Sequence, residues 1–196
     1  GESPDEVTLV AAARDAGYTL VGRKTFADGS FVTQVEGTAG TQEEHHVRHV
    51  LGFTSDRKRM SVVCVSADGG ATVITKGADS VMERLIADPL PADAKGALTE
   101  FSRQGLRTLV VASRRMAPEA YASWRADWDA AGAAMSDREA RLERVTDAAE
   151  AGLAYLGVTA NEDRLQDHVP ETIKTVRAAG VRVWVLTGDK VETAVE

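Results

Sequence analysis

The sequence predicts an α+β fold, in which an antiparallel β-sheet is flanked by helices and followed by an incomplete α/β segment. The first supporting observation is a series of strand-like runs at 46–54, 59–66 and 71–76, joined by short turns. Consecutive strands connected so tightly must be antiparallel. The second is a change of pattern after Gly152, where a strand and a helix precede a run at 181–186 that is apolar almost throughout. Such a run is typical of a parallel strand covered on both faces.

The first helix is predicted from its start and stop signals. Ser3 is a cap residue, Pro4 occupies the first helical position, and Glu6 follows the cap by three residues, which is the capping-box pattern. The helix then runs to about Ala16 and ends at Gly17. The other predicted elements are strands at 18–24, 31–36, 107–115 and 153–159, a loop at 37–44, and helices at 81–87, 92–104, from Pro118, from Ser136 to about Glu150, and at 169–179.

Two of these helices carry distinctive side chains. Tyr121, Trp124 and Trp128 share one face of the helix that Pro118 opens, and we interpret this stripe as core or lid packing. The helix at 136–150 begins with a second capping box and is rich in charged residues, which are expected to face water.

The C-terminal part of the chain follows a different pattern. The run at 181–186 leads into Thr-Gly-Asp at 187–189 and a new helix, which is the layout of a doubly wound sheet with ligands at the carboxyl ends of its strands. We therefore divide the chain into an antiparallel domain at 1–164 and a partial second domain at 165–196. Since the chain begins at a helix cap and stops inside a predicted helix, we expect it to be a piece of something longer.

Composition argues against several classes of function. The formal net charge of −7 over 196 residues argues against a nucleic-acid partner, because binding to a phosphate backbone needs a basic face. Cys64 is the sole cysteine and lies in an apolar strand, so we expect a buried thiol rather than a nucleophile. The 4 histidines are not at metal-ligand spacing. Without a long apolar run or a signal peptide, the chain as given is expected to be soluble. We also expect it to be monomeric.

A candidate nucleotide site lies in two segments that are close in the sequence. Phe53 opens a cation-rich turn, and its ring could stack on a purine while Lys58 reaches the base edge or the phosphates. Lys76 ends a strand beside Gly77, and glycine lets a ligand approach the backbone closely. The sequence contains no P-loop motif, and an aromatic ring, several cations and a Lys-Gly step could bind a purine triphosphate without one.

Each candidate also has a purely structural interpretation. Phe53 could be a core residue on a strand, and Arg57, Lys58 and Arg59 could simply be solvated. Lys76 could be an edge-strand lysine. Further structural interpretations apply to Ser55 as the start of a turn, Arg107 as a strand-start arginine, Glu6 as a capping-box residue and Asp189 as the cap of the last helix.

Six segments together resemble the P-type ATPases, specifically the type IV members, the phospholipid flippases. In the family's order they are SPDE at 3–6, FTSDRKRMSV at 53–62, TKGAD at 75–79, GLRTL at 105–109, EDRLQDHVPETI at 162–173 and VWVLTGDKVETA at 183–194. The type IV assignment rests mainly on FTSDRKRMSV and RLQDHVPETI. In that family a nucleotide-binding domain, an antiparallel sheet flanked by helices, is inserted into a phosphorylation domain of haloacid-dehalogenase fold. Residues 165–196 would begin a segment of that second domain.

The resemblance implies a base and sugar pocket. Glu6 would recognise the adenine edge and Phe53 would stack on the ring. Ser55, Lys58 and Lys76 would line the pocket around the base and sugar.

The resemblance also implies where the phosphates lie. Arg107 and Thr108 would contact them, while Thr187, Gly188 and Asp189 would belong to the phosphate side of the phosphorylation domain. The family's DKTGT, whose aspartate is phosphorylated, and its GDGxND, which helps hold Mg2+, are absent from this chain. No catalytic residue is therefore expected here, and Mg2+ would be bound mainly by residues outside the chain.

By the same resemblance, the chain would be the cytosolic ATP- or ADP-binding domain of a multi-pass membrane protein, positioning ATP for phosphorylation of an aspartate elsewhere. Phospholipid would be handled by the parent's membrane helices, with an accessory membrane subunit as a partner. Two other classes stay open. One is a fragment of a haloacid-dehalogenase-type phosphatase, suggested by strand, Thr-Gly-Asp and helix. The other is a non-catalytic interaction module that uses the aromatic helix at 121–128.

Overall fold

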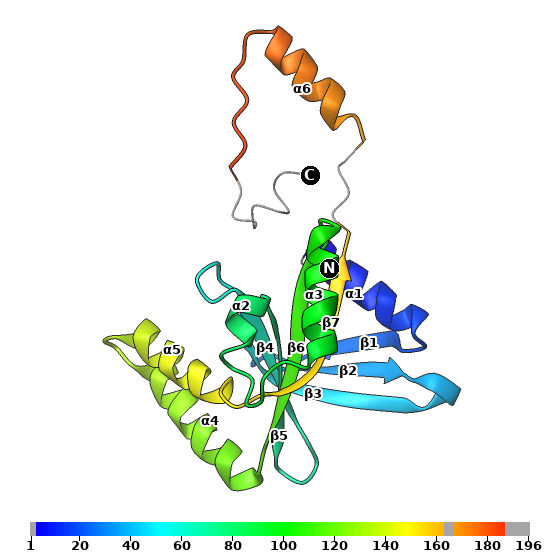
Figure 1. Ribbon diagram of the computed structural model, residues 1–196. Coiled ribbons are helices and arrows are strands. Elements are labelled where there is room, and N and C mark those ends of the chain that lie inside the picture. Colours follow the sequence, from blue (N-terminus) through cyan, green and yellow to red (C-terminus); the bar gives the residue numbers. More distant parts are fainter. Residues whose placement is uncertain (1–2, 163–166, 187–196) are drawn as a thin grey trace.

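The computed structural model describes residues 3–162 and 167–186. Within these residues, seven strands form one antiparallel sheet whose spatial order follows the sequence (Figure 1). The strands are β1 (Thr19–Thr25), β2 (Phe31–Glu36), β3 (Gln42–Leu51), β4 (Arg59–Val65), β5 (Ala71–Gly77), β6 (Arg107–Met116) and β7 (Ala154–Asn161). The helices are α1 (Pro4–Asp15), α2 (Asp79–Met82), α3 (Ala92–Arg103), α4 (Pro118–Ala133), α5 (Arg138–Ala149) and α6 (Val169–Ala178), with a 3-10 turn, η1, at Thr38–Gly40. The predicted α+β fold with an antiparallel sheet is confirmed.

Side-chain alternation along the strands separates a covered face of the sheet from an open one. On β5, Ala71, Val73 and Thr75 are buried, whereas the alternate residues Ile74 and Lys76 are at least partly exposed. Successive strand residues point to opposite faces, so the first set marks the covered face and the second marks the open face.

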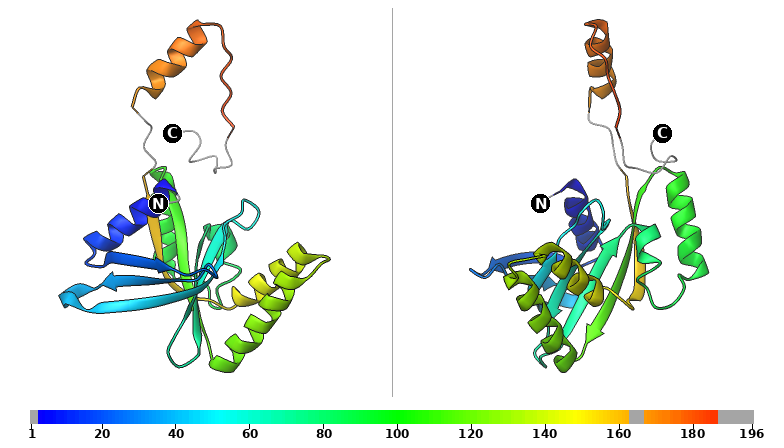
Figure 2. Two further views of the ribbon diagram at one scale, coloured as in Figure 1. Left: turned by 180° about the vertical axis from the view of Figure 1, so that it is seen from behind. Right: turned by 90° about the vertical axis from the view of Figure 1, so that its left-hand side faces the viewer.

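Helices α2 to α5 pack on the covered face. Tyr121 and Trp124 of α4 and Ala149 of α5 join one hydrophobic cluster with strand residues that include Val63 and Val73. A second cluster joins α2 and α3 to β6 and the start of β7, with the members Met82, Ile86, Leu90, Leu98, Val110, Ala112 and Leu153. Helix α1 lies on the other side of the sheet from α3, as the right-hand view of Figure 2 shows. No helix in the described part of the chain is both long enough and apolar enough to cross a membrane.

The aromatic stripe on α4 is a core element, as predicted. Tyr121 and Trp124 are only 6% and 7% exposed, and their rings pack with that of Trp128 around His49 from β3. The Trp124 indole N–H donates to the backbone oxygen of Val145, 2.9 Å away, which joins α4 to α5.

Two predicted boundaries are wrong because long-range backbone pairing overrides the local signal. The segment expected to be a loop up to residue 44 is strand from Gln42, since it pairs in register with β2. The helix expected at 81–87 ends at Met82, because the backbones of Leu85 and Ala87 bond with that of Leu153 instead.

The second predicted capping box does not form. Helix α5 begins after Asp137, whose φ of 52° lies in the left-handed region and whose side chain makes no capping bond. The Asp137 side chain therefore leaves the orphan N–H groups of the first turn without the acceptor that a capping side chain supplies.

The predicted strand at 181–186 is also wrong. Helix α6 forms as expected, but residues 181–186 have no regular secondary structure, and Val185 and Leu186 are 83% and 93% exposed. A strand needs a neighbour to bond its backbone groups, and the described part of the chain offers this run none. The α/β segment is thus not shown, and the domain division after residue 164 falls outside the described residues and stays a prediction.

Candidate functional site

The candidate residues meet at one end of the sheet. In an antiparallel sheet, the carboxyl end of each strand lies beside the amino end of the next. The pairing of Gly77 with Arg59 on one side and Val110 on the other places the ends of β3 and β5 beside the starts of β4 and β6. The turn at 52–58, Lys76 and the start of β6 therefore lie together.

Lys76 projects from the open face of the sheet. It lies directly opposite Met60 on β4 and Val111 on β6, and residues opposed in this way share a face. Its ammonium forms an ion pair with the carboxylate of Glu6 on α1, and the two side chains are 22% and 37% exposed. Ile74 shares this face and is also partly exposed. A partly buried cation thus lies beside an apolar surface that a ligand can reach.

Glu6 has two structural uses at once. Its backbone N–H donates to the Ser3 hydroxyl over 3.3 Å, so the predicted cap of α1 is present. Its carboxylate contacts Lys76. Capping therefore leaves the Glu6 side chain available to the candidate site.

The turn after β3 presents Phe53 to solvent. The Phe53 side chain is 62% exposed, which excludes the interpretation that it is a core residue. Ser55 and Lys58 are exposed beside it. Lys58 adopts a left-handed φ of 50°, fixed by its N–H to the oxygen of Thr54 (2.8 Å) and by its oxygen accepting from the N–H of Ala78 (3.0 Å). The turn is therefore bonded directly to the chain just beyond Lys76.

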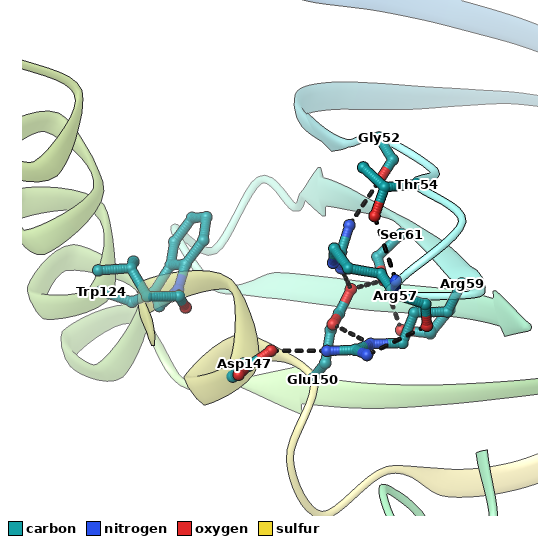
Figure 3. A network of polar contacts seen from close by, with 10 residues as sticks. Gly52, Thr54, Arg57, Arg59, Ser61, Trp124, Asp147 and Glu150 are labelled. Carbon is teal, nitrogen blue, oxygen red and sulfur yellow. Dashed lines mark hydrogen bonds and ion pairs between the residues drawn. The ribbon is translucent and has the colours of Figure 1, made fainter. Parts of the chain in front are cut away.

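The other two cations of the turn point away from the site, into the helical layer (Figure 3). Arg57 and Arg59 both contact the carboxylate of Glu150, which is completely buried, and Arg59 also contacts Asp147 at 2.6 Å. The Ser61 hydroxyl donates to the same carboxylate at 2.6 Å. The expectations that these arginines are merely solvated and that the charges of this helix face water are therefore wrong for these residues.

One local signal hints at this network. Arg59 has the same strand parity as Ser61 and Val63, whose burial marks the covered face, so its side chain must enter the helical layer. The sequence offers no comparable signal for Glu150, since its partners come from a distant strand.

Gly77 serves the fold rather than a ligand. A Cβ added to it would lie 2.6 Å from the Cβ of Arg59 and 2.9 Å from the backbone oxygen of Lys58. The space that the missing side chain leaves is thus filled by β4 itself. The suggestion that this glycine lets a ligand approach the backbone is not supported.

The two residues predicted to contact phosphates lie on opposite faces. Arg107 has the parity of Val111, so it lies on the open face with Lys76, and it is 4.0 Å from the carboxylate of Asp5. Thr108 has the parity of the buried Val110 and lies on the covered face. Strand geometry therefore favours Arg107 as a ligand contact over Thr108.

The other predicted phosphate contacts, Thr187, Gly188 and Asp189, lie outside the described residues. Within the described ones, the site presents an exposed aromatic ring, a carboxylate and at least two cations at one end of an open sheet face. Such a surface suits a ligand with a planar ring and attached anionic groups. A hollow of about 330 Å³, lined by residues of α4 and α5 such as Trp124 and Arg144, contains none of the predicted site residues.

Comparison with known families agrees with this arrangement. The family described as "P-type ATPase, cytoplasmic domain N" matches residues 2–168, which include the entire seven-stranded sheet. This chain belongs to the P-type ATPase N-domain family.

The similar proteins are all named as phospholipid-transporting ATPases. This N domain is 43% identical over 199 residues to "Phospholipid-transporting ATPase DNF1" of Chaetomium thermophilum. It is 41% identical over 200 residues to "Phospholipid-transporting ATPase 10" of Arabidopsis thaliana, and 40% identical over 195 residues to "Phospholipid-transporting ATPase IK" of Mus musculus. These alignments cover 98% or 99% of this chain but only 12% to 16% of each relative. The resemblance to phospholipid-transporting P-type ATPases is confirmed, and the N domain spans a small part of such a protein.

Proposed function

We propose that this N domain binds ATP on the open face of its sheet and, within a longer phospholipid-transporting ATPase, positions it for phosphorylation of an aspartate outside this chain. The observation that carries the proposal is the meeting of Phe53, Lys76 and Glu6 at one end of the sheet face that α2 to α5 leave open. Membership of an ATPase family and the names of the relatives support it.

The chemistry of these side chains suggests how the nucleotide lies. The purine would stack on Phe53, and stacking of a base on an aromatic ring is worth about 1–3 kcal/mol. The Glu6 carboxylate can accept from the adenine amino group, while Ser55, Lys58 and Lys76 lie around the base and sugar. Arg107 lies further along the same face, where its guanidinium suits the phosphates.

The remaining phosphate contacts would come from Thr187, Gly188 and Asp189. Mg2+ would accompany ATP on its phosphates, because this ion keeps much of its coordination by phosphate and water oxygens. Delivery of the terminal phosphate to a remote aspartate is then mainly a matter of orientation.

For the parent protein, we infer a membrane enzyme whose cytosolic side carries this domain as a single copy per chain. Phospholipid would be moved by membrane helices outside this chain, and an accessory membrane subunit would bind there. The two other classes considered for the sequence gain no support. The aromatic helix is core rather than a contact surface, and Thr-Gly-Asp lies outside the described residues.

An NMR titration of the 196-residue chain with ATP tests the proposal. Amide and side-chain signals of Phe53 and Lys76 should shift with added ATP. The Lys76→Met variant should bind about 10–100-fold more weakly, since hydrogen bonds to charged groups contribute about 1.5–3 kcal/mol. Affinity in the millimolar range corresponds to about 4 kcal/mol, which an open surface with few contacts can supply.

Lys95→Met provides the matched control. Lys95 lies on α3, in the helical layer, and is 53% exposed beside Glu83. Removing its charge should leave ATP affinity unchanged. Signals of Phe53 and Lys76 that stay fixed at millimolar ATP, or equal losses in the two variants, would refute the proposed site.

A further inference from the structure

The buried carboxylate of Glu150 is placed where a carboxylate is least expected. It caps the carboxyl end of α5, where the helix dipole disfavours negative charge, and its side chain is 0% exposed. Two arginines compensate for this. Arg57 binds one carboxylate oxygen, and Arg59 binds the other through Nε at 2.5 Å. The Ser61 hydroxyl donates to the first oxygen and lies 2.8 Å from the hydroxyl of Thr75.

The end of α5 is itself fixed to the rest of the fold. Arg114 of β6 donates to the backbone oxygens of Ala148 and Ala151, at 3.2 Å and 2.8 Å. One turn earlier, the Trp124 indole donates to Val145. Glu150 therefore projects from a rigid base, and any group bonded to it takes its position from the core.

Arg57 passes that position on to the turn. Its guanidinium contacts Glu150 at one end and donates to the backbone oxygen of Gly52 over 2.5 Å at the other. Its backbone N–H donates to the Thr54 hydroxyl over 3.1 Å. Gly52 and Thr54, which Figure 3 shows bonded to Arg57, are the sequence neighbours of Phe53. One largely buried arginine side chain, that of Arg57, thus ties the two neighbours of the exposed ring to the core.

We propose that Glu150 is a positioning residue for nucleotide binding, which holds the turn at 52–58 through Arg57 so that Phe53 presents its ring above the open sheet face. This inference rests on the proposed function. Glu150 lies in the helical layer on the covered side of the sheet, whereas Lys76 lies on the open side. The effect of Glu150 therefore passes through the turn and not through contact with the nucleotide.

Removal of the Glu150 charge should release the turn rather than unfold the domain. Without their shared counter-charge, Arg57 and Arg59 would be two like charges held close in a desolvated site, an arrangement that costs free energy. Arg57 is 15% exposed and lies in a surface turn, so it can relieve that cost by moving into water. Gly52 and Thr54 then lose their anchor, and Phe53 samples positions that do not stack on a base.

The test compares Glu150→Gln with Glu143→Gln in the 196-residue chain. Both substitutions replace a carboxylate of α5 by an amide, but Glu143 is exposed. We expect Glu150→Gln to raise the Kd for ATP about tenfold, because the apparent Kd scales inversely with the fraction of protein in the competent conformation. Glu143→Gln should leave this Kd unchanged. Amide signals at 53–55 should move in the ligand-free Glu150→Gln protein.

A second ligand separates positioning from general damage. Tripolyphosphate offers charge to Lys76 and Arg107 but has no ring to stack on Phe53. Its Kd should therefore be equal in the wild-type and Glu150→Gln proteins. Partial unfolding would instead weaken the binding of ATP and of tripolyphosphate by the same factor. If Glu150→Gln does not fold, Arg57→Lys is the second variant. Lysine keeps the positive charge beside Glu150 but lacks the second guanidinium nitrogen that reaches Gly52. Arg57→Lys should therefore raise the Kd for ATP and leave that for tripolyphosphate unchanged.

The outcomes distinguish the two proposals. If the wild-type chain binds ATP at Phe53 and Lys76 but a folded Glu150→Gln protein binds it equally well, the positioning role is overturned and the proposed function stands. Equal weakening of ATP and tripolyphosphate likewise overturns positioning. If the wild-type chain does not bind ATP, the proposed function fails and this inference fails with it.

Discussion

Replacing Gly77 by alanine places a methyl group where β4 already lies. The added Cβ would be 2.6 Å from the Cβ of Arg59, 2.9 Å from the backbone oxygen of Lys58 and 3.1 Å from the Cα of Arg59. Gly77 is not among the residues with positive φ, so alanine meets no backbone strain there. The effect of the substitution is therefore steric.

The magnitude follows from these distances. Carbon atoms in favourable contact lie about 3.5–4.0 Å apart, so β4 must move away by roughly 1 Å. Arg59 resists this movement, because its guanidinium is bonded to the buried Glu150. Overpacking typically costs about 1–3 kcal/mol, and we expect the upper half of that range. Each kcal/mol lowers the Tm of a domain of this size by about 2–4 °C, so the expected loss is roughly 5–10 °C.

Urea denaturation followed by circular dichroism measures this cost, with Gly96→Ala as the control. Gly96 lies inside α3 and has no atom within 4 Å of an added Cβ. Alanine there should be neutral or should stabilise the helix by up to about 1 kcal/mol. The reasoning is refuted if the two variants change stability alike, or if Gly77→Ala stays within about 0.5 kcal/mol of wild type.

Three further predictions concern the core and its titrating groups. Trp124→Phe removes the hydrogen bond to Val145 and should lower the free energy of unfolding, measured by urea denaturation, by about 1–3 kcal/mol. Trp184→Phe is the control, because Trp184 is 78% exposed and its substitution should not change this free energy. Burial lowers the pKa of His49 below that of the unfolded chain, so stability should be fully present above about pH 6.5 and decline as the pH falls toward the lower folded value. His49→Phe should flatten that decline, and an unchanged slope would contradict the assignment. Burial also raises the pKa of the Cys64 thiol, so alkylation by iodoacetamide at neutral pH should be slower in the folded chain than in urea, and equal rates would exclude this.

Much of the fold follows from local signals that the structure preserves. Ser3 and Pro4 start α1 as predicted, and Gly17 and Gly105 follow the ends of α1 and α3 with the left-handed φ values of 93° and 68° that favour glycine. The turn pairs between the closely spaced strands predict their antiparallel pairing, because short connections leave that as the available geometry.

The wrong predictions of element boundaries share a physical cause, which is backbone pairing between distant segments. The backbone of Leu85 bonds with Leu153 instead of continuing a helix, and the first residues of β3 are strand because β2 lies beside them. No periodicity or capping rule encodes such partners. The run at 181–186 shows the converse, because strong strand propensity gives no strand in the absence of a neighbour.

For the candidate site, the sequence identifies the residues better than it identifies their roles. Phe53 could have been a core residue or a ligand contact, and its exposure excludes the first of these. The cation-rich turn looked uniform, but the structure divides it between Lys58 on the surface and two arginines in the helical layer. Strand parity could have placed Arg59 in the helical layer, whereas the position of Arg57 in the turn and the burial of Glu150 required knowing where α5 packs.

The order of the strands has a consequence for how the domain folds. Since β1 to β5 follow one another through short connections, this part of the sheet is built from contacts of short sequence separation, which can form quickly and in succession. The β5–β6 and β6–β7 pairings span the helices between these strands and join more distant segments. The polar contacts that fix the candidate site and the turn beside it are different, because Lys76 and Glu6 are 70 residues apart and Arg59 and Glu150 are 91 apart. These long loops carry the largest closure entropy, so their contacts should form after the hairpins have assembled. A chain that has made its sheet but not these two closures would have native strands and a disordered binding surface, so nucleotide affinity would report the last step of folding.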